Sequence, residues 1–389
     1  EPALAHWQQH REDVIQRTLA IQSIPAPTFE EQARSDLVAE QFRALGLADV
    51  HQDQIANVYG RTVGRDPDSP AVLVSAHLDT VFPRSMDLTT RFEASGRIYG
   101  PGVGDNSLGV AALLSLVELV QQRGLQPASD IWWVATVGEE GLGDLRGIRR
   151  VVERLHDRLG VGIIIEGIGL GWLYHAGLGV RRLRISVQAP GGHSWLHPPP
   201  PSAIHHLLKL GAALVNEVHP PEAPRSAFNI GLVEGGTSIN TRAPSASLSI
   251  DLRSVDPRTL EALEARIRDV VSRLAHAADI TVEIDVIGDR PSATLSPGHP
   301  LVLAAQKVLE YLGGAQASLS VGSTDANILL ARGIPSVCVG VTTGGSPHTI
   351  DEYIDTGPVA LGMQQLTLLA FLAARHARAW SQWLDASDQ

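Results

Sequence analysis

The fold is indicated most clearly by residues 71–78, which read Ala-Val-Leu-Val-Ser-Ala-His-Leu. This nearly continuous apolar run is typical of a strand buried on both faces, in a sheet that helices cover on each side. Similar runs occupy residues 131–137, 161–165 and 334–339. The stretches with the apolar spacing of helices are 7–22, 30–45, 108–120 and 300–312. This pattern predicts an α/β fold with a mostly parallel sheet flanked by helices.

Residues 181–287 have a different hydropathy pattern, because apolar and polar residues alternate there with a period of two. Such alternation marks strands with one buried and one polar face. With helices at 202–217 and 257–275 and a further strand at 227–233, the order is β-α-β-β-α-β, a ferredoxin-like unit. We therefore predict one domain formed by 1–180 and 288–389, and a second domain, 181–287, inserted into it. The exposed strand edges make the inserted domain a candidate dimerisation surface; the alternative is a monomer whose helices cover one face.

The composition excludes several classes of protein. The 389 residues carry a formal net charge of −11, which argues against a nucleic-acid partner. The single Cys, Cys338, excludes an internal disulfide and a Cys-rich zinc site, so a bound metal must use His, Asp and Glu. The longest apolar stretches, 108–120 and 361–374, are interrupted by polar residues and fall short of the roughly 20 residues of a membrane span. No signal peptide is visible, so a cytoplasmic location is the default expectation, although the chain does not begin with Met.

Polar residues follow the predicted buried strands, at the edge where open α/β sheets bind their ligands. His77 and Asp79 end the first run, and a metal-bound His commonly has a carboxylate beside its second nitrogen. Glu139 and Glu140 lie between glycines after 131–137, and Glu166 directly follows 161–165. Each motif also has an ordinary interpretation, as a surface hydrogen-bonded pair, a solvated turn or a carboxylate with a structural partner.

Two further candidates lie in glycine-rich segments. Asp105 follows Gly100-Pro-Gly-Val-Gly, which permits a tight turn, although Asp105 could instead be only the N-cap of the next helix. His348 lies in Gly344-Gly-Ser-Pro-His, where a solvated loop histidine is the alternative. If Asp105 bridges two metals, each metal has three protein ligands and a shared water completes an open catalytic geometry. The two sets are His77, Asp105 and Glu166, and Asp105, Glu140 and His348, which leaves Glu139 as a general base.

The motifs resemble those of the M20 family of metallopeptidases, which includes glutamate carboxypeptidases, aminoacylases, dipeptidases and deacylases. The resemblance covers nearly the whole chain and rests on Ser75-Ala-His77-Leu-Asp79-Thr-Val, Gly100-Pro-Gly-Val-Gly-Asp105-Asn, Glu139-Glu140-Gly, Glu166-Gly and Pro347-His348-Thr-Ile-Asp-Glu. It implies a di-metal hydrolase domain with an inserted lid and dimerisation domain. It further implies two zinc ions per subunit, with Co²⁺ or Mn²⁺ as other options. Asp79 would orient His77, and Glu139 would carry the proton from water to the leaving amine.

The resemblance also assigns roles within the inserted domain. His193, in Gly191-Gly-His-Ser, is similar to a lid histidine that reaches the partner subunit's active site and stabilises the oxyanion. Asn240 is similar to a substrate-contacting Asn, and Arg253 to an Arg that binds the substrate's carboxylate through its planar guanidinium. The residues alone leave other interpretations open: a simple turn at His193, and a surface salt bridge from Arg253 to Asp251 or Asp256. Arg242 and the prolines at 198–201 depart from the family's pattern.

The sequence therefore predicts a homodimeric di-zinc amidohydrolase. Glu166, where some relatives carry Asp, and Arg253 favour a peptide or N-acyl amide bond next to a free α-carboxylate. The alternatives are an N-carbamoyl or N-succinyl amino-acid deacylase, an aminopeptidase of the same family, and a non-catalytic binding protein with the M20 fold. The expected partners are a small peptide or N-acyl amino acid and a second copy of the chain, with no nucleic acid and no membrane.

Overall fold

The computed structural model describes residues 2–275 and 279–383, and the chain divides into two compact units. Unit 1 comprises Glu1–Gly177 and Thr294–Gln389, and unit 2 comprises Leu178–Ala293. The sequence had placed these divisions at 181 and 287, a few residues inside the structural ones. Each unit has a hydrophobic core of its own.

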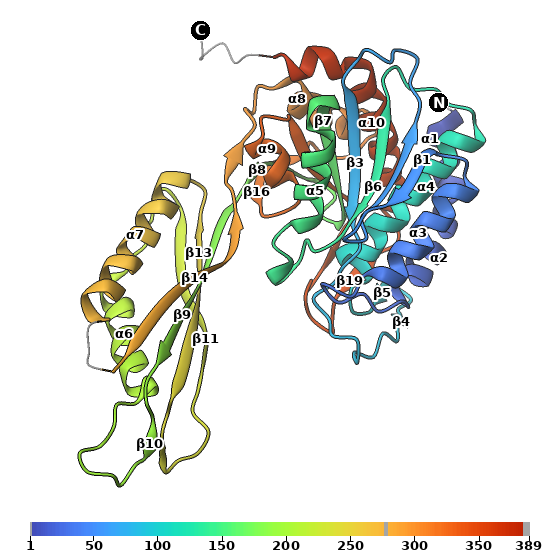
Figure 1. Ribbon diagram of the computed structural model, residues 1–389. Coiled ribbons are helices and arrows are strands. Elements are labelled where there is room, and N and C mark those ends of the chain that lie inside the picture. Colours follow the sequence, from blue (N-terminus) through green and yellow to red (C-terminus); the bar gives the residue numbers. More distant parts are fainter. Residues whose placement is uncertain (1, 276–278, 384–389) are drawn as a thin grey trace. The chain divides into compact units, whose positions relative to one another are not determined.

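Unit 1 is built on a nine-stranded sheet with the order β1-β2-β6-β3-β7-β17-β8-β15, in which β16 also pairs with β8 (Figure 1). The neighbours β6, β3, β7 and β17 are parallel to one another, as the buried apolar runs predict. The strands are β1 (Ala48–Gln52), β2 (Val58–Thr62), β3 (Ala71–His77), β6 (Ile131–Thr136), β7 (Leu159–Ile168), β8 (Trp172–Gly177), β15 (Ala293–Thr294), β16 (Ser318–Gly322) and β17 (Ser336–Thr342). Every residue of β3, β6 and β17 is buried, so these strands lie inside the layers of helices.

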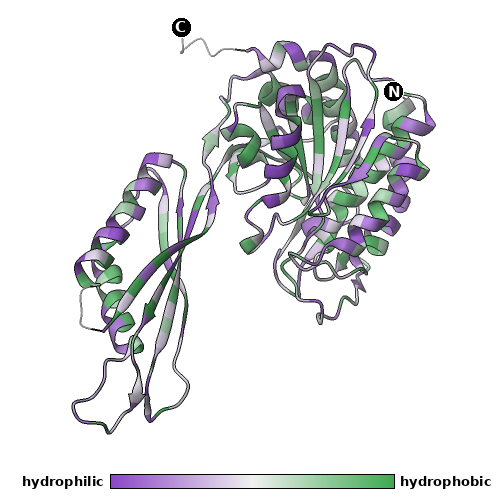
Figure 2. Ribbon diagram, in the orientation of Figure 1, coloured by the Kyte–Doolittle hydropathy of each residue, from purple (hydrophilic) through white to green (hydrophobic). Residues whose placement is uncertain are grey.

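Helices cover both faces of this sheet, and the strands between them are largely apolar (Figure 2). The helices are α1 (Pro2–Gln9), α2 (Arg11–Gln22), α3 (Gln32–Ala44), α4 (Gly109–Gln122), α5 (Arg146–Leu155), α8 (Pro300–Tyr311), α9 (Ala326–Ala331) and α10 (Val359–Ser381). A π-helical turn, η1 (Val103–Leu108), leads into α4. Together they form an apolar stretch, Val103–Gln122, long enough to cross a membrane, but 89% of its most apolar window is buried in the fold. This stretch therefore has the burial of a core helix.

Unit 2 is an antiparallel four-stranded sheet with two helices, and its strand order is β11-β13-β9-β14. This is the ferredoxin-like arrangement that the alternating pattern predicts. The elements are β9 (Gly179–Gln188), α6 (Ala203–Glu217), β11 (Ser226–Gly235), β13 (Ser245–Ser254), α7 (Pro257–Leu274) and β14 (Thr281–Arg290). A small two-stranded ladder joins β10 (Gly192–His193) to β12 (Thr241–Arg242). The helices cover one face of the sheet, with Leu183, Ile185 and Ile250 among the buried residues.

Some elements differ from the sequence prediction. The single helix expected at 7–22 is two helices, because His10 leaves the helical conformation and its ring stacks on His6 at a centroid distance of 3.9 Å. The helices α5, α9 and α10 were not predicted. Neither was a small antiparallel sheet of order β18-β19-β5-β4, which consists of β18 (Gly344–Gly345), β19 (Tyr353–Asp355), β5 (Arg97–Tyr99) and β4 (Arg91–Phe92).

Candidate metal centre

The candidate ligands gather at the carboxyl ends of three adjacent parallel strands. His77 is the last residue of β3, where it pairs with Thr136 of β6. Glu139 and Glu140 follow β6 after a turn, and Glu166 lies near the end of β7 on the other side of β3. Because these strands run in the same direction, their side chains meet at a single edge of the sheet.

The first ligand group consists of His77, Asp105 and Glu166. The Nε2 atom of His77 lies 3.2 Å from Oδ1 of Asp105 and 3.5 Å from Oε2 of Glu166. His77 is only 2% exposed, whereas the two carboxylates are partly exposed. The interpretation of Asp105 as an N-cap is wrong, since α4 is preceded by Leu108 and has no side-chain cap.

The second ligand group consists of Asp105, Glu140 and His348. The Nε2 atom of His348 lies 3.1 Å from Oδ2 of Asp105 and 3.0 Å from Oε1 of Glu140. Asp105 therefore presents Oδ1 to the first group and Oδ2 to the second, as a bridging carboxylate would. His348 is about half exposed, so this group opens to solvent.

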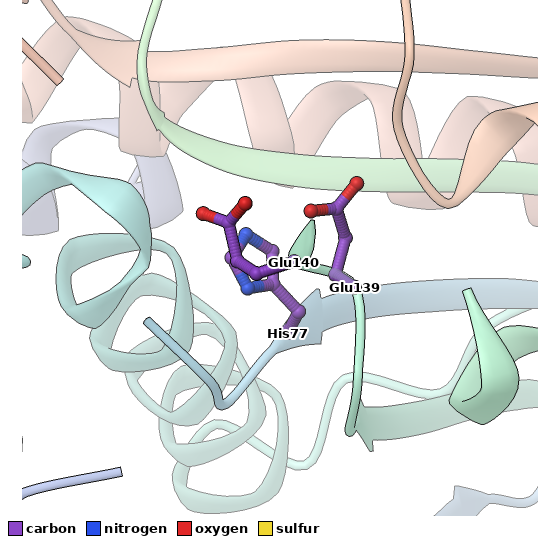
Figure 3. A group of neighbouring side chains, drawn as sticks. All are labelled: His77, Glu139 and Glu140. Atoms are coloured by element: carbon purple, nitrogen blue, oxygen red, sulfur yellow. The ribbon is translucent and has the colours of Figure 1, made fainter. Parts of the chain in front are cut away.

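A third combination, His77, Glu139 and Glu140, also has ligand atoms within 4.8 Å of one another. Figure 3 shows the imidazole of His77 and the two carboxylates on the same side of the strand ends. Glu139 is thus close enough to act either as an alternative ligand or as a general base beside the ligands.

The protonation behaviour of the two histidines is set by the carboxylates around them. Burial alone would lower the pKa of His77, but the Glu166 and Asp105 carboxylates raise it well above the usual value. Hydrogen bonds to Asp105 and Glu140 raise the pKa of His348 to about 10. Both imidazoles therefore lie where positive charge is favoured.

Burial has the opposite consequence for the carboxylates. It raises the pKa of Glu166 to about 7 and also raises the pKa of Glu140. Burial acts in the same direction on Asp105, yet hydrogen bonds from His348 and His77 hold its pKa below the usual range. Burying several carboxylates together is costly unless cations compensate them. Imidazole nitrogens and carboxylate oxygens are also the ligands that zinc accepts, so these residues fit two divalent metal ions.

Asp79 contacts the imidazole of His77 and also holds the backbone of two neighbouring glutamates. The Nδ1 atom of His77 lies 3.1 Å from the backbone carbonyl oxygen of Asp79, but 3.6 Å from the carboxylate. The Asp79 carboxylate also accepts hydrogen bonds from the backbone N–H groups of Glu139 and Glu140, at 3.0 and 2.9 Å, and from the hydroxyl of Thr28. The fully buried Asp79 thus fixes the backbone of both glutamates.

Two supporting residues were missed by the sequence analysis. Asn106 is fully buried and binds the backbone on both sides of Glu166. Its Nδ2 donates to the carbonyl of Ile165, and its Oδ1 accepts from the N–H of Gly167, both at 2.9 Å. Glu352, at the end of the quoted His348 motif, binds backbone N–H groups of the segment that carries Asp105. Adjacency to the ligand motifs was the only sequence signal for either residue.

The three remaining candidates belong to unit 2. His193 and Asn240 lie together near the β10–β12 ladder, where the N–H of Ser194 donates to the carbonyl of Asn240. Nδ1 of His193 accepts a hydrogen bond from the N–H of Trp195. Arg253 is exposed on β13 and forms an ion pair with Asp251 at 2.8 Å, which is the salt bridge that the sequence left open.

Comparison with known proteins gives the same picture. Residues 73–371 match the model of peptidase family M20/M25/M40. A putative succinyl-diaminopimelate desuccinylase from Mycobacterium tuberculosis is 28% identical over 92% of this chain and 97% of its own length. A deformylase from Bacillus subtilis that acts on N-formyl-4-amino-5-aminomethyl-2-methylpyrimidine is 25% identical over 89% of this chain and 91% of its own.

Solved structures share the fold. A tripeptidase from Staphylococcus aureus has a TM-score of 0.76 and 24% identity, covering 94% of this chain and 99% of its own. A dinuclear metal binding peptidase of the M20 family from Bacillus subtilis has a TM-score of 0.67 and 17% identity, covering 95% of this chain and 99% of its own.

Proposed function

Since the chain belongs to peptidase family M20/M25/M40, a family of hydrolases acting on amide and peptide bonds, we propose that it cleaves a peptide or N-acyl amide bond next to a free α-carboxylate. The observation that carries the proposal is the pair of ligand groups sharing Asp105. Two divalent cations held there, which we propose to be zinc, would lower the pKa of a shared water and polarise the scissile carbonyl.

The residues around this centre would each have a separate role in the reaction. His77 and Glu166 would hold one metal, and Glu140 and His348 the other, with Asp105 common to both. Glu139 would accept the proton of the attacking water and deliver it to the leaving amine. Asp79 would keep Glu139 and Glu140 in place through their N–H groups. His193, acting on the partner subunit as in the resembling family, would stabilise the oxyanion.

The free carboxylate of the substrate would be bound by Arg253, with Asn240 contacting the substrate nearby. A guanidinium suits this role because its N–H groups form paired, charge-assisted bonds to a carboxylate. In the structure Arg253 binds Asp251, which Arg182 also contacts at 3.2 Å. Asp251 can therefore keep Arg182 as a partner while Arg253 binds the substrate.

The second candidate is hydrolysis of an N-succinyl or N-carbamoyl amino acid. The similarity to the Mycobacterium tuberculosis desuccinylase favours the succinyl form. Both candidates use the same metal centre and leave a free amine, so they differ only in the acyl group that the site admits.

A substrate panel tests these proposals. Dipeptides and N-acetyl, N-succinyl and N-carbamoyl amino acids would be assayed, each with a free and an amidated α-carboxylate. We expect chelator-sensitive hydrolysis of the free acids and at least about tenfold weaker turnover of the amides, because a charged hydrogen bond is worth about 1.5–3 kcal/mol. Arg253→Ala should remove the preference for the acid, whereas Arg268→Ala, on the same unit, should keep it. Equal turnover of acids and amides by the wild-type protein would contradict the carboxylate proposal.

We also propose a homodimer formed through unit 2. The edge strand β11 and the helix α6 expose apolar side chains, with Val233 62% and Val215 58% exposed. An open edge with apolar neighbours is suited to pairing with a second copy. We expect Val215→Asp to shift a dimer to a monomer in light scattering, while Leu303→Asp, at an exposed position on α8 of unit 1, should leave the dimer intact. A wild-type monomer at micromolar concentration would contradict the proposal.

A further inference from the structure

Glu352 is a fully buried carboxylate that binds three backbone N–H groups of one short segment. Its Oε1 accepts from Gly104 at 2.7 Å and from Asp105 at 2.8 Å, and its Oε2 accepts from Gly102 at 3.2 Å. A carboxylate suits this arrangement, because both of its oxygens accept hydrogen bonds and neither carries a proton to repel the donors. Glu352 thus holds the segment that carries Asp105, the ligand common to both groups, through the backbone N–H groups of that segment.

The same residue ties this segment to the one that carries His348. The carbonyl of Glu352 accepts the N–H of Gly100 at 2.9 Å, and its own N–H donates to the carbonyl of Thr349 at 3.2 Å. The adjoining strand β19 pairs with β5, just before Gly100. Glu352 therefore connects the segments of two different ligands, which lie 243 residues apart in the chain.

The position is an unfavourable one for a carboxylate that only supports the fold. Glu352 lies near the Asp105 carboxylate, whose negative charge opposes its own. The buried guanidinium of Arg34 offsets part of this charge. Cations bound by Asp105 would offset more of it, so the cost of burying Glu352 falls when the metal centre is filled.

We propose that Glu352 is a positioning residue of the metal centre, which holds the Asp105 segment so that one carboxylate oxygen faces each ligand group. This inference rests on the proposed di-metal function. It predicts that Glu352 acts on metal affinity and on the geometry of the centre, beyond any contribution to stability. Supporting groups of this kind typically change metal affinity or activity by about 10–100-fold.

The test begins with the metal content and affinity of the wild-type protein, measured by elemental analysis and by competition with a chromophoric chelator. Glu352→Gln keeps the size of the side chain, but its amide N–H₂ must face one of the three N–H donors. We expect the affinity for the second metal equivalent to fall about 10–100-fold and the visible spectrum of the Co²⁺-loaded protein to change. The control is Asp130→Asn, which removes a carboxylate that accepts the N–H of Gly64 at 2.8 Å, beside the opposite end of β6. It should leave both readouts unchanged.

The outcomes separate this inference from the proposed function. A wild-type protein that binds fewer than two metals would overturn both. A wild-type protein that binds two, with Glu352→Gln matching its affinity and cobalt spectrum, would overturn only the role of Glu352. Amide hydrogen exchange on the wild-type chain provides a check that does not need the variant to fold. The N–H groups of Gly102, Gly104 and Asp105 should be protected even after metal removal, and rapid exchange there would overturn the proposal.

Discussion

Glu139 and Glu140 are neighbours in the chain with separate surroundings. The backbone N–H groups of both residues donate to the Asp79 carboxylate, which fixes the positions of their Cα atoms. Oε1 of Glu140 lies 3.0 Å from His348, within the second ligand group. Glu139 belongs only to the third combination, with His77 and Glu140. The two carboxylates can therefore be distinguished by what their removal does to metal content.

We expect Glu139→Ala to retain two metals and the folded structure, but to lose at least about 10²-fold in kcat, the usual effect of removing a general base. Metal analysis and steady-state kinetics on the same preparation provide the measurement. Glu140→Ala is the comparison variant and should lose metal from the second group. If Glu139→Ala instead binds one metal, Glu139 is a ligand and the third combination is the correct one.

The grouping of the candidate ligands could be predicted at this scale because each of them follows a recognisable apolar strand or a glycine-rich turn. His77, Asp105, Glu140, Glu166 and His348 are brought together as the sequence predicts. The supporting contacts could not be predicted in the same way. Glu352 acts on backbone N–H groups almost 250 residues away, and Asp79 binds the N–H groups of Glu139 and Glu140 in addition to contacting the imidazole of His77. Such contacts depend on the path of the backbone through the fold, so the residue types alone do not predict them.

Among the elements, the buried apolar strands and several helices were predicted, whereas the 23-residue helix α10 and the shortest strands were missed. The strands β3, β6 and β7 carry continuous apolar runs, so their burial follows from composition. The strands of the small sheet are two or three residues long, and β19 pairs with the distant β5, Tyr353 lying opposite Tyr99. No local pattern specifies such a pairing.

The helix α8 offers a prediction about pH, because a histidine caps it. Nδ1 of His299 accepts the N–H of Leu301, and Nε2 donates to the carbonyl of Trp380, both at 3.1 Å. The bond from Leu301 requires the neutral imidazole, because a protonated Nδ1 cannot accept, whereas Nε2 can donate to Trp380 in either form. Burial lowers the pKa of His299 below its usual value, so below about pH 6.5 the unfolded chain binds this proton more readily than the folded one. The contribution of His299 to stability should therefore be lost as the pH falls through this range.

Urea unfolding at about pH 7.5 and about pH 5.5 measures this effect. His299→Asn keeps a capping acceptor but cannot titrate, so its stability should fall less on acidification than that of the wild-type protein. His299→Ala should cost about 1 kcal/mol at the higher pH, through loss of the cap. The exposed His219→Asn serves as a control and should follow the wild-type protein. Parallel curves for His299→Asn and the wild-type protein would show that the cap does not titrate.

At the scale of the whole molecule, unit 1 and unit 2 are each stabilised by a hydrophobic core of their own. The candidate metal centre and its supporting residues lie wholly in unit 1. Unit 2 has its own core between a four-stranded sheet and two helices, with Ile267 and Val270 fully buried. Separate cores of this kind can unfold independently, so a single unfolding free energy need not describe the chain.

We expect calorimetry to resolve two transitions, of which only one responds to metal. A ligand that binds the folded state at about 1,000 times its Kd stabilises it by about 4 kcal/mol, so a chelator should lower the transition of unit 1 and leave that of unit 2 in place. Ile267→Ala should do the reverse, because a large-to-small change in a core costs about 2–5 kcal/mol and this residue is in unit 2. The metal content of Ile267→Ala should equal that of the wild-type protein. A single transition that both the chelator and Ile267→Ala displace would mean that the units unfold together, and the metal would then stabilise the whole chain.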